Sequence, residues 1–132
     1  MDLYLHMVII FDNIAQMKWQ IEFFNEQVFE DAERMPKGIK AKFIKISELI
    51  EEFGPEIGMP HVETIKGSDS HGLFEMRPRG KEGIARALFC TLPGKKVIVL
   101  HCVIKKADKL RKTDLDTAKR RMKEVKDGKY KF

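Results

Sequence analysis

Four basic side chains in the second half of the sequence are of the types that phosphate chemistry requires. Arg77 and Arg86 lie in neighbouring segments that a polar turn at residues 79–83 separates. His101 and Lys105 lie in one later apolar segment, where alternation places them on the same face of a strand. Guanidinium groups grip phosphate oxygens bidentately, and a histidine or a suitably placed lysine can transfer protons near neutral pH. RNA carries its own nucleophile, the 2′-hydroxyl, so this set predicts RNA cleavage without a metal.

Two further cations, Arg79 and Lys106, are close enough in sequence to converge on the same site. A simpler interpretation remains open for each residue. An arginine on an exposed strand is usually only solvated, and His101 inside the run VIVLHCVI could be a buried, hydrogen-bonded core residue. The pair Lys105-Lys106 could mark only the exit of a strand into solvent.

Positive charge is concentrated at the end of the chain. The net charge is +5, yet residues 105–132 carry twelve Lys or Arg against five Asp or Glu, which leaves a net −2 for residues 1–104. A local basic excess attracts polyanions, of which nucleic acid is the commonest. Lys109, Arg111 and Arg120 are therefore candidate RNA contacts, although a solvated basic helix would have the same composition.

These residues need elements that position them, and the apolar patterning predicts an α+β fold. Alternating residues predict a strand at 19–23, and helical spacing predicts a helical hairpin over 25–53. A loop-rich stretch with a short strand at 62–66 follows, and then strands at 73–77, 84–91 and 96–104. An apolar stripe predicts a last helix over 113–125. We expect a curved antiparallel sheet with the hairpin packed on one face and a C-terminal helix, which could leave the other face open to RNA.

The chain length of 132 residues fits one domain. We expect residues 1–17 to be a dispensable extension, residues 18–126 to be the folded domain, and residues 127–132 to be a basic tail. No run approaches 18 apolar residues and no export signal is visible, which predicts a cytoplasmic protein without a membrane partner. Cys90 and Cys102 lie in apolar runs typical of buried small hydrophobes. The four histidines lack metal-ligand spacing, so neither a metal nor another cofactor is predicted.

Residues 72–109 resemble the core of the RelE/HigB superfamily of bacterial toxins, in particular a phage-derived branch. The branch pattern matches Gly72 with Phe74-Glu75-Met76-Arg77, then Arg86, Leu100-His101 with Lys105-Lys106, and Ala118 with Arg120-Arg121. The loop at residues 53–60 resembles the Gly-x-x-Leu-Gly-x-Pro of the family. The similarity extends over roughly residues 18–126, and the order and spacing of the motifs make it fairly specific.

The sequence departs from the family pattern at three places. Cys102 and Val103 stand where glycine and phenylalanine are usual, and the residues after Lys106 lack the usual Thr-Pro ending. No tyrosine occupies the late catalytic position that some members use, because Tyr130 lies beyond the last predicted helix. These departures leave the predicted fold unchanged and leave the general base unassigned.

The resemblance implies a RelE-like microbial ribonuclease fold and an mRNA-cleaving toxin that acts at the ribosomal A site and leaves a cyclic phosphate. It implies a cognate antitoxin, often a helix-turn-helix protein. Carried over by position, Arg77 and Arg86 would contact the scissile phosphate, and Lys105 with Lys106 would stabilise charge or transfer protons, with His101 as a further candidate. The alternatives are a non-catalytic RNA- or ribosome-binding module, and a degenerate toxin that only binds its antitoxin.

Overall fold

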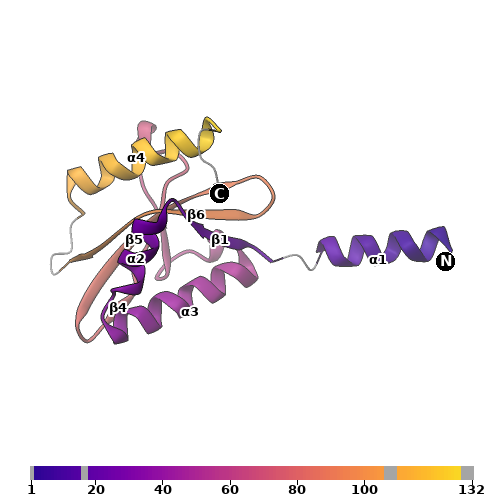
Figure 1. The fold of residues 1–132 in the computed structure, drawn as a ribbon, viewed down its shortest axis with the longest axis horizontal. Helices are drawn as coiled ribbons and strands as arrows, with labels where there is room; N and C mark the ends of the chain where they lie inside the picture. Colours follow the sequence, from indigo (N-terminus) through magenta and orange to yellow (C-terminus); the bar gives the residue numbers. More distant parts are fainter. Residues whose placement is uncertain (1, 16–17, 106–109, 129–132) are drawn as a thin grey trace.

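The computed structural model describes residues 2–15, 18–105 and 110–128, except for the side chains of residues 10–15, 68 and 105 (Figure 1). In chain order the elements are α1 (Leu3–Ala15), β1 (Gln20–Phe23), α2 (Glu26–Glu33), α3 (Lys37–Phe53), η1 (Pro55–Ile57), β2 (Val62–Thr64), η2 (Ser68–Ser70), β3 (Phe74–Met76), β4 (Arg79–Gly80), β5 (Gly83–Leu92), β6 (Lys96–Lys105) and α4 (Lys112–Lys126). The η elements are short 3₁₀ turns.

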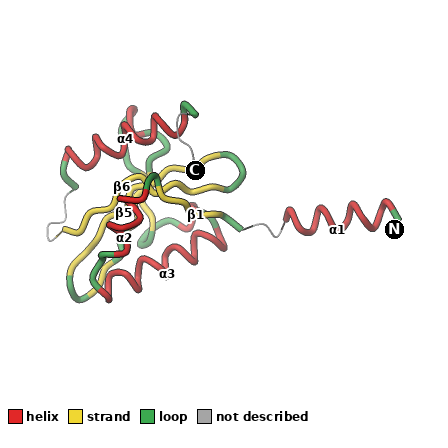
Figure 2. The backbone as a smooth tube through the Cα atoms, in the orientation of Figure 1, coloured by secondary structure: helices red, strands yellow, loops and turns green. Residues whose placement is uncertain are grey.

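One mixed sheet organises these elements, with strand order β1-β6-β5-β3-β2 and with β4 paired to β5 (Figure 2). β5 and β6 form a long hairpin, and β3 and β2 continue the sheet antiparallel to it. The expected α+β fold is confirmed. One pairing differs from expectation, because β1 runs parallel to β6. Parallel neighbours need a long crossover, and the chain between β1 and β6 supplies one.

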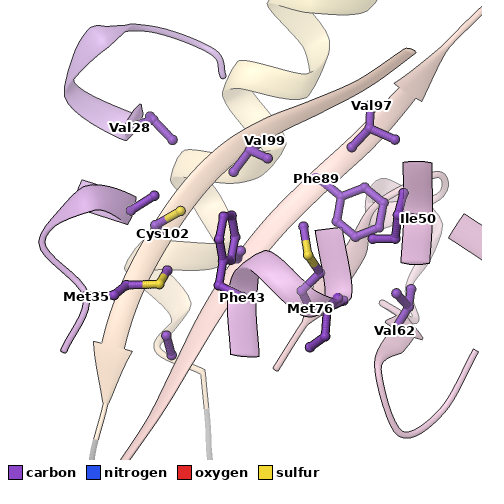
Figure 3. Close-up of a cluster of buried hydrophobic side chains, with 14 of the residues drawn as sticks. Val28, Met35, Phe43, Ile50, Val62, Met76, Phe89, Val97, Val99 and Cys102 are labelled. Carbon is purple, nitrogen blue, oxygen red and sulfur yellow. The ribbon is translucent and has the colours of Figure 1, made fainter. Parts of the chain in front are cut away.

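The helical hairpin α2–α3 covers one face of this sheet, as predicted. Asn25 caps the N-terminus of α2, because its side chain accepts a hydrogen bond from the Val28 backbone N–H at 2.9 Å. The apolar stripes of both helices are buried against the strands (Figure 3). The cluster contains Val28, Ala32, Ile39, Phe43, Ile46 and Ile50 from the helices, and Ala87, Phe89, Val97 and Val99 from the strands. This core fixes the sheet on which the site is built.

Helix α3 ends where the sequence predicts, at Phe53, and Gly54 follows with φ +84°. A Cβ at Gly54 would lie 2.8 Å from Nε1 of Trp19, so both the backbone conformation and the close packing require glycine. Trp19 itself packs against the hairpin-side core. The α3 end and the start of β1 are thus joined by one tight contact.

The second face of the sheet is partly covered, which corrects the expectation that it is left open. α4 packs there through Ala118, Met122 and Val125. Leu73, Leu88, Cys90, Ile98 and Leu100 are the buried strand and loop residues beneath it. Arg121 of α4 donates to the backbone oxygen of Leu100 at 2.7 Å, and this contact fastens the helix to β6. The sheet therefore carries two cores, one on each face.

A β-bulge changes which side chains of β6 face α4. Leu88 of β5 pairs with His101, but the next residue, Phe89, pairs with Val99, so Leu100 is the extra residue. Leu100 lies in the α4-side core, and His101 contacts Asp114 of α4. Cys102 then lies with Val99 in the core under the helical hairpin α2–α3. The bulge turns His101 toward α4 rather than into the core under the helical hairpin.

Residues 3–15 form α1, which Figure 1 draws apart from the sheet and its covering helices. Leu3 and Tyr4 are 71 % and 76 % exposed, and no described side chain at the start of this helix belongs to either core. The dispensability of residues 1–17 stays a prediction. None of the helices in the described part of the chain has both the length and the apolar character needed to cross a membrane.

Candidate active site

The register of the strands brings Glu63, Glu75 and Arg86 to one face. Glu63 of β2 pairs with Glu75 of β3, and Glu75 pairs with Leu88 of β5. Residues directly opposite in an antiparallel pair point to the same side, and Arg86 lies two residues before Leu88. All three side chains therefore lie on the face that α4 partly covers. Arg77 follows β3 and contacts both carboxylates, which places it in the same cluster.

Glu75 joins the two arginines that the sequence singles out. Its Oε1 accepts a hydrogen bond from Nη1 of Arg86 at 2.9 Å and another from Nε of Arg77. A second carboxylate, that of Glu63, contacts Nη2 of Arg77. The expectation that Arg77 and Arg86 converge is therefore met, with a glutamate between them that the sequence analysis did not assign.

Burial differs sharply among these four side chains. Glu75 is 1 % exposed and Arg86 is 4 % exposed, whereas Arg77 is 33 % and Glu63 is 37 % exposed. The hydrogen bond that Arg77 donates to Glu75 is the largest influence that raises the pKa of Arg77 above its usual range. The negative charges of Glu75 and Glu63 raise this pKa further, and partial burial opposes them. Arg77 is thus a permanent cation at the surface, and Arg86 is a fixed cation below it.

A hollow of about 330 Å³ opens beside this cluster, and we call it the arginine cleft. Its lining consists of Glu63, Thr64, Ile65, Lys66, Glu75, Arg77, Arg86 and Leu110. The Nε of Arg86 is buried and has no hydrogen-bond partner among the described residues. A buried donor without a partner is uncommon in folded proteins. Two guanidiniums therefore line the cleft, that of Arg77 partly exposed and that of Arg86 buried with a donor that is not paired.

The structure places His101 beside α4 rather than in the arginine cleft. Its Nε2 lies 2.9 Å from Oδ1 of Asp114, and the two side chains are 18 % and 14 % exposed. A carboxylate partner fixes the orientation of an imidazole ring. His101 also lines a separate hollow of about 420 Å³ with residues of α2. His101 is therefore not a fully buried core residue. It also does not line the cleft that contains Arg77 and Arg86.

The remaining predicted RNA contacts are dispersed. Arg79 is exposed on β4, Arg111 is exposed immediately before α4, and Arg120 is exposed on α4. Of these three arginines, Arg111 alone is next in sequence to a residue of the cleft lining, Leu110. Lys106 and Lys109 lie outside the described residues. The backbone of Lys105 pairs with Ile84 at the end of β6, but its side chain also lies outside what is described.

The sequence analysis missed Glu63 and Glu75 as residues of the site, and it missed Asp114 as the partner of His101. Glu75 had a signal, because alternation in residues 73–77 puts Glu75 and Arg77 on one face. Glu63 had none, since its role depends on the pairing of β2 with β3. The described residues include no group of three or more His, Cys, Asp or Glu side chains placed to hold a metal ion.

The two cysteines are buried and free, as predicted. They face opposite cores, Cys90 under α4 and Cys102 under the helical hairpin. Burial raises the pKa of Cys90 to about 11 and that of Cys102 to about 12. Neither thiol is available as a nucleophile near neutral pH.

The chain matches the model of the family described as phage-derived protein Gp49-like (DUF891) over residues 30–123. Among solved structures it is similar to the archaeal RelE–RelB complex from Pyrococcus horikoshii OT3, with 17 % identity, a TM-score of 0.50, and coverage of 70 % of this chain and 100 % of that chain. A second similar structure is the YoeB–YefM complex from Staphylococcus aureus, with 20 % identity, a TM-score of 0.49, and coverage of 67 % and 98 %. No curated protein matches the chain. Because the family model extends over more than half of its length, the chain belongs to the phage-derived Gp49-like family, and its fold is similar to that of the archaeal RelE.

Proposed function

We propose that this protein is the toxin of a toxin–antitoxin pair, a metal-independent endoribonuclease that cleaves mRNA on the ribosome. The observation that supports it most is the pinning of Arg77 and Arg86 by the buried Glu75 at the edge of an open cleft. Two guanidiniums held at fixed positions are suited to a phosphate whose charge increases during reaction. The basic C-terminal segment adds attraction for a polyanion.

The reaction begins when a phosphate of the mRNA enters the arginine cleft. Arg77 keeps its Nε bond to Glu75 and transfers Nη2 from Glu63 to a phosphate oxygen, which its partial exposure permits. Arg86 donates from below through its unpaired Nε. Both guanidiniums then stabilise the negative charge that builds on the phosphorus centre while the 2′-oxygen attacks it.

Proton transfer completes the reaction. Glu63, released from Arg77 and partly exposed in the cleft, accepts the proton of the 2′-hydroxyl. The 2′-oxygen then bonds to phosphorus and the bond to the 5′-oxygen breaks. Lys105 gives a proton to that leaving oxygen. His101 lies outside the arginine cleft and is not assigned a step. The products are a 2′,3′-cyclic phosphate and a 5′-hydroxyl, and no metal takes part.

We propose partners from the similarity of the fold to the archaeal RelE and from the proposed substrate. The archaeal RelE of similar fold was solved in a complex with RelB, and we assign this protein an equivalent antitoxin, of the helix-turn-helix class. Cleavage of ribosome-bound mRNA places the protein in the cytoplasm. Arg79, Lys106, Lys109, Arg111 and Arg120 are assigned to RNA or ribosome contacts away from the reacting phosphate.

One observation favours a second candidate, a protein that binds RNA or its antitoxin without cleaving. The charges of Arg77 and Arg86 are matched by those of Glu63 and Glu75, so this cluster has no net charge. If Glu63 is not displaced, the site stays closed to phosphate, and the fold would serve binding alone.

The test separates the two candidates. Purified protein is added to a cell-free translation reaction with a defined mRNA, with and without ribosomes, and new 5′ ends are mapped by primer extension. The proposal predicts new ends only in the reactions that contain ribosomes, and it predicts that these ends carry 5′-hydroxyl groups. Intact mRNA from folded protein would reject the nuclease in favour of the binding protein.

A further inference from the structure

A second hollow, of about 270 Å³, lies next to the arginine cleft. It lies between α3, the loop after η1 and the segment that joins β3 to β4. The side chains that give it its character are those of Lys42, Ile46, Met59, His61, Arg79 and Ile84. We call it the basic hollow.

Arg77 lines both the arginine cleft and the basic hollow. The two hollows therefore meet at the guanidinium that the proposed reaction places on the scissile phosphate. An RNA strand with that phosphate at Arg77 has a nucleotide on each side of it. The basic hollow is the place that the structure offers to one of these two neighbours.

The basic hollow carries more unopposed positive charge than the arginine cleft. None of the described residues that line it carries a carboxylate. Within the described residues, neither Lys42 nor Arg79 forms an ion pair, in contrast to Arg77 and Arg86. An anion entering from solvent meets two free cations here before it reaches the neutralised cluster. This arrangement suits a backbone phosphate next to the one that reacts.

The other side chains that line the basic hollow are apolar or aromatic. A site for a small inorganic ion does not need such side chains. Lys42 and Ile46 are one helical turn apart on α3, so the cation lies directly beside an apolar floor. Met59 is 62 % exposed at the mouth. Backbone hydrogen bonds to the oxygen of Gly58, from His61 at 3.1 Å and from Val62 at 3.0 Å, hold the loop that presents Met59 and His61.

From this lining we infer that the basic hollow is a nucleotide subsite for single-stranded RNA. Lys42 and Arg79 bind the phosphate, and the base lies against Met59 with the imidazole of His61 stacked on its face. The inference rests on the proposed function, because it takes the scissile phosphate to lie at Arg77. It adds a second recognition site, built by α3 and the loop of residues 58–62, to the cleft where the reaction takes place.

The test measures binding separately from cleavage. The probe is a fluorescein-labelled hexaribonucleotide with every 2′-hydroxyl methylated, so that it cannot be cleaved, and fluorescence anisotropy is recorded with the full-length protein across a salt series. The test variants are Lys42→Ala and His61→Ala. The matched controls are Lys45→Ala, which removes the same charge from an exposed position of α3 outside the hollow, and His71→Ala, which removes an exposed imidazole elsewhere.

The two variants are expected to fail in different ways. Lys42→Ala should lower the dependence of log Kd on log salt concentration by about 0.7, the value for one phosphate contact on a single strand. His61→Ala should weaken binding about 5- to 100-fold with an unchanged salt slope, as when a stacking side chain is truncated. Both control variants should match the wild type.

Three results would overturn the inference: no binding of the probe by the wild type, test variants that behave like their controls, or equal competition by inorganic phosphate at the same charge concentration. Cleavage is read in the translation assay and is independent of this outcome. A wild type that cleaves while Lys42→Ala and His61→Ala match their controls removes the subsite only. A wild type that does not cleave, with binding still sensitive to both changes, removes the nuclease only.

Discussion

Replacing Glu75 with alanine removes the carboxylate that holds both arginines of the site. Glu75 is 1 % exposed and its partner Arg86 is 4 % exposed, so the pair is withdrawn from water. Removing one partner of a buried ion pair leaves an uncompensated charge, which costs about 3–5 kcal/mol. We expect Glu75→Ala to lower the free energy of unfolding by about that amount, a large share of the roughly 5–15 kcal/mol of a typical domain.

Urea unfolding followed by far-ultraviolet circular dichroism measures this loss. The control is Glu33→Ala, which breaks an exposed ion pair with Lys40 and should cost less than about 1 kcal/mol. A double variant, Glu75→Ala with Arg86→Met, should regain much of the loss because no buried charge remains unpaired.

Two results would refute this reasoning. One is a Glu75→Ala variant as stable as Glu33→Ala. The other is a double variant whose loss equals the sum of its two single losses, because that sum would mean that Glu75 and Arg86 do not act on each other.

Three further predictions concern the scaffold. Gly80→Ala should destabilise the fold by about 1–3 kcal/mol in the same urea assay, because its Cβ would lie 2.7 Å from the backbone nitrogen of Ile39; an unchanged midpoint would contradict this packing. Cys90 and Cys102 should resist alkylation at pH 8 until the protein unfolds. Alkylation of the native protein at pH 8 would contradict this. Their raised pKa values keep the native thiols protonated while unfolded thiols ionise above about pH 9, so the free energy of unfolding should fall as pH rises from there. Deleting residues 2–17 should leave the urea midpoint unchanged, and an unfolded product would show that α1 supports the domain.

Local patterns predicted most of the elements, because their causes lie within a few residues. Asn25 is a helix cap by its own side chain, and Gly54-Pro55 ends a helix by its backbone preferences. The run 96–104 is apolar on both sides, as a strand buried under helices on both faces must be. The same run therefore indicated that the second face of the sheet is also covered, although the sequence analysis did not draw that conclusion.

The geometry of the site depends on the register in which the strands pair. That register is not determined by the residues of any one strand. The bulge at Leu100 is set by the pairing of β6 with β5, and it decides that His101 meets Asp114. Likewise, Glu63 reaches Arg77 only because β2 pairs with β3 in one register. A shift by one residue would send that carboxylate to the other face. The arginines could be predicted from the sequence, whereas their carboxylate partners required the structure.

The most direct test of the central claim is the single-turnover rate of ribosome-dependent mRNA cleavage by Arg77→Ala. Arg77 is partly exposed, and its loss leaves the buried pair of Glu75 and Arg86 in place. The matched control is Arg34→Ala, which removes the same side chain from an exposed position outside the cleft. Losing one donor to the charge that develops in the transition state predicts a rate about 100- to 1000-fold lower for Arg77→Ala, with the control near the wild-type rate. Cleavage by Arg77→Ala at the wild-type rate would contradict the account, because the scissile phosphate would then not lie at this guanidinium.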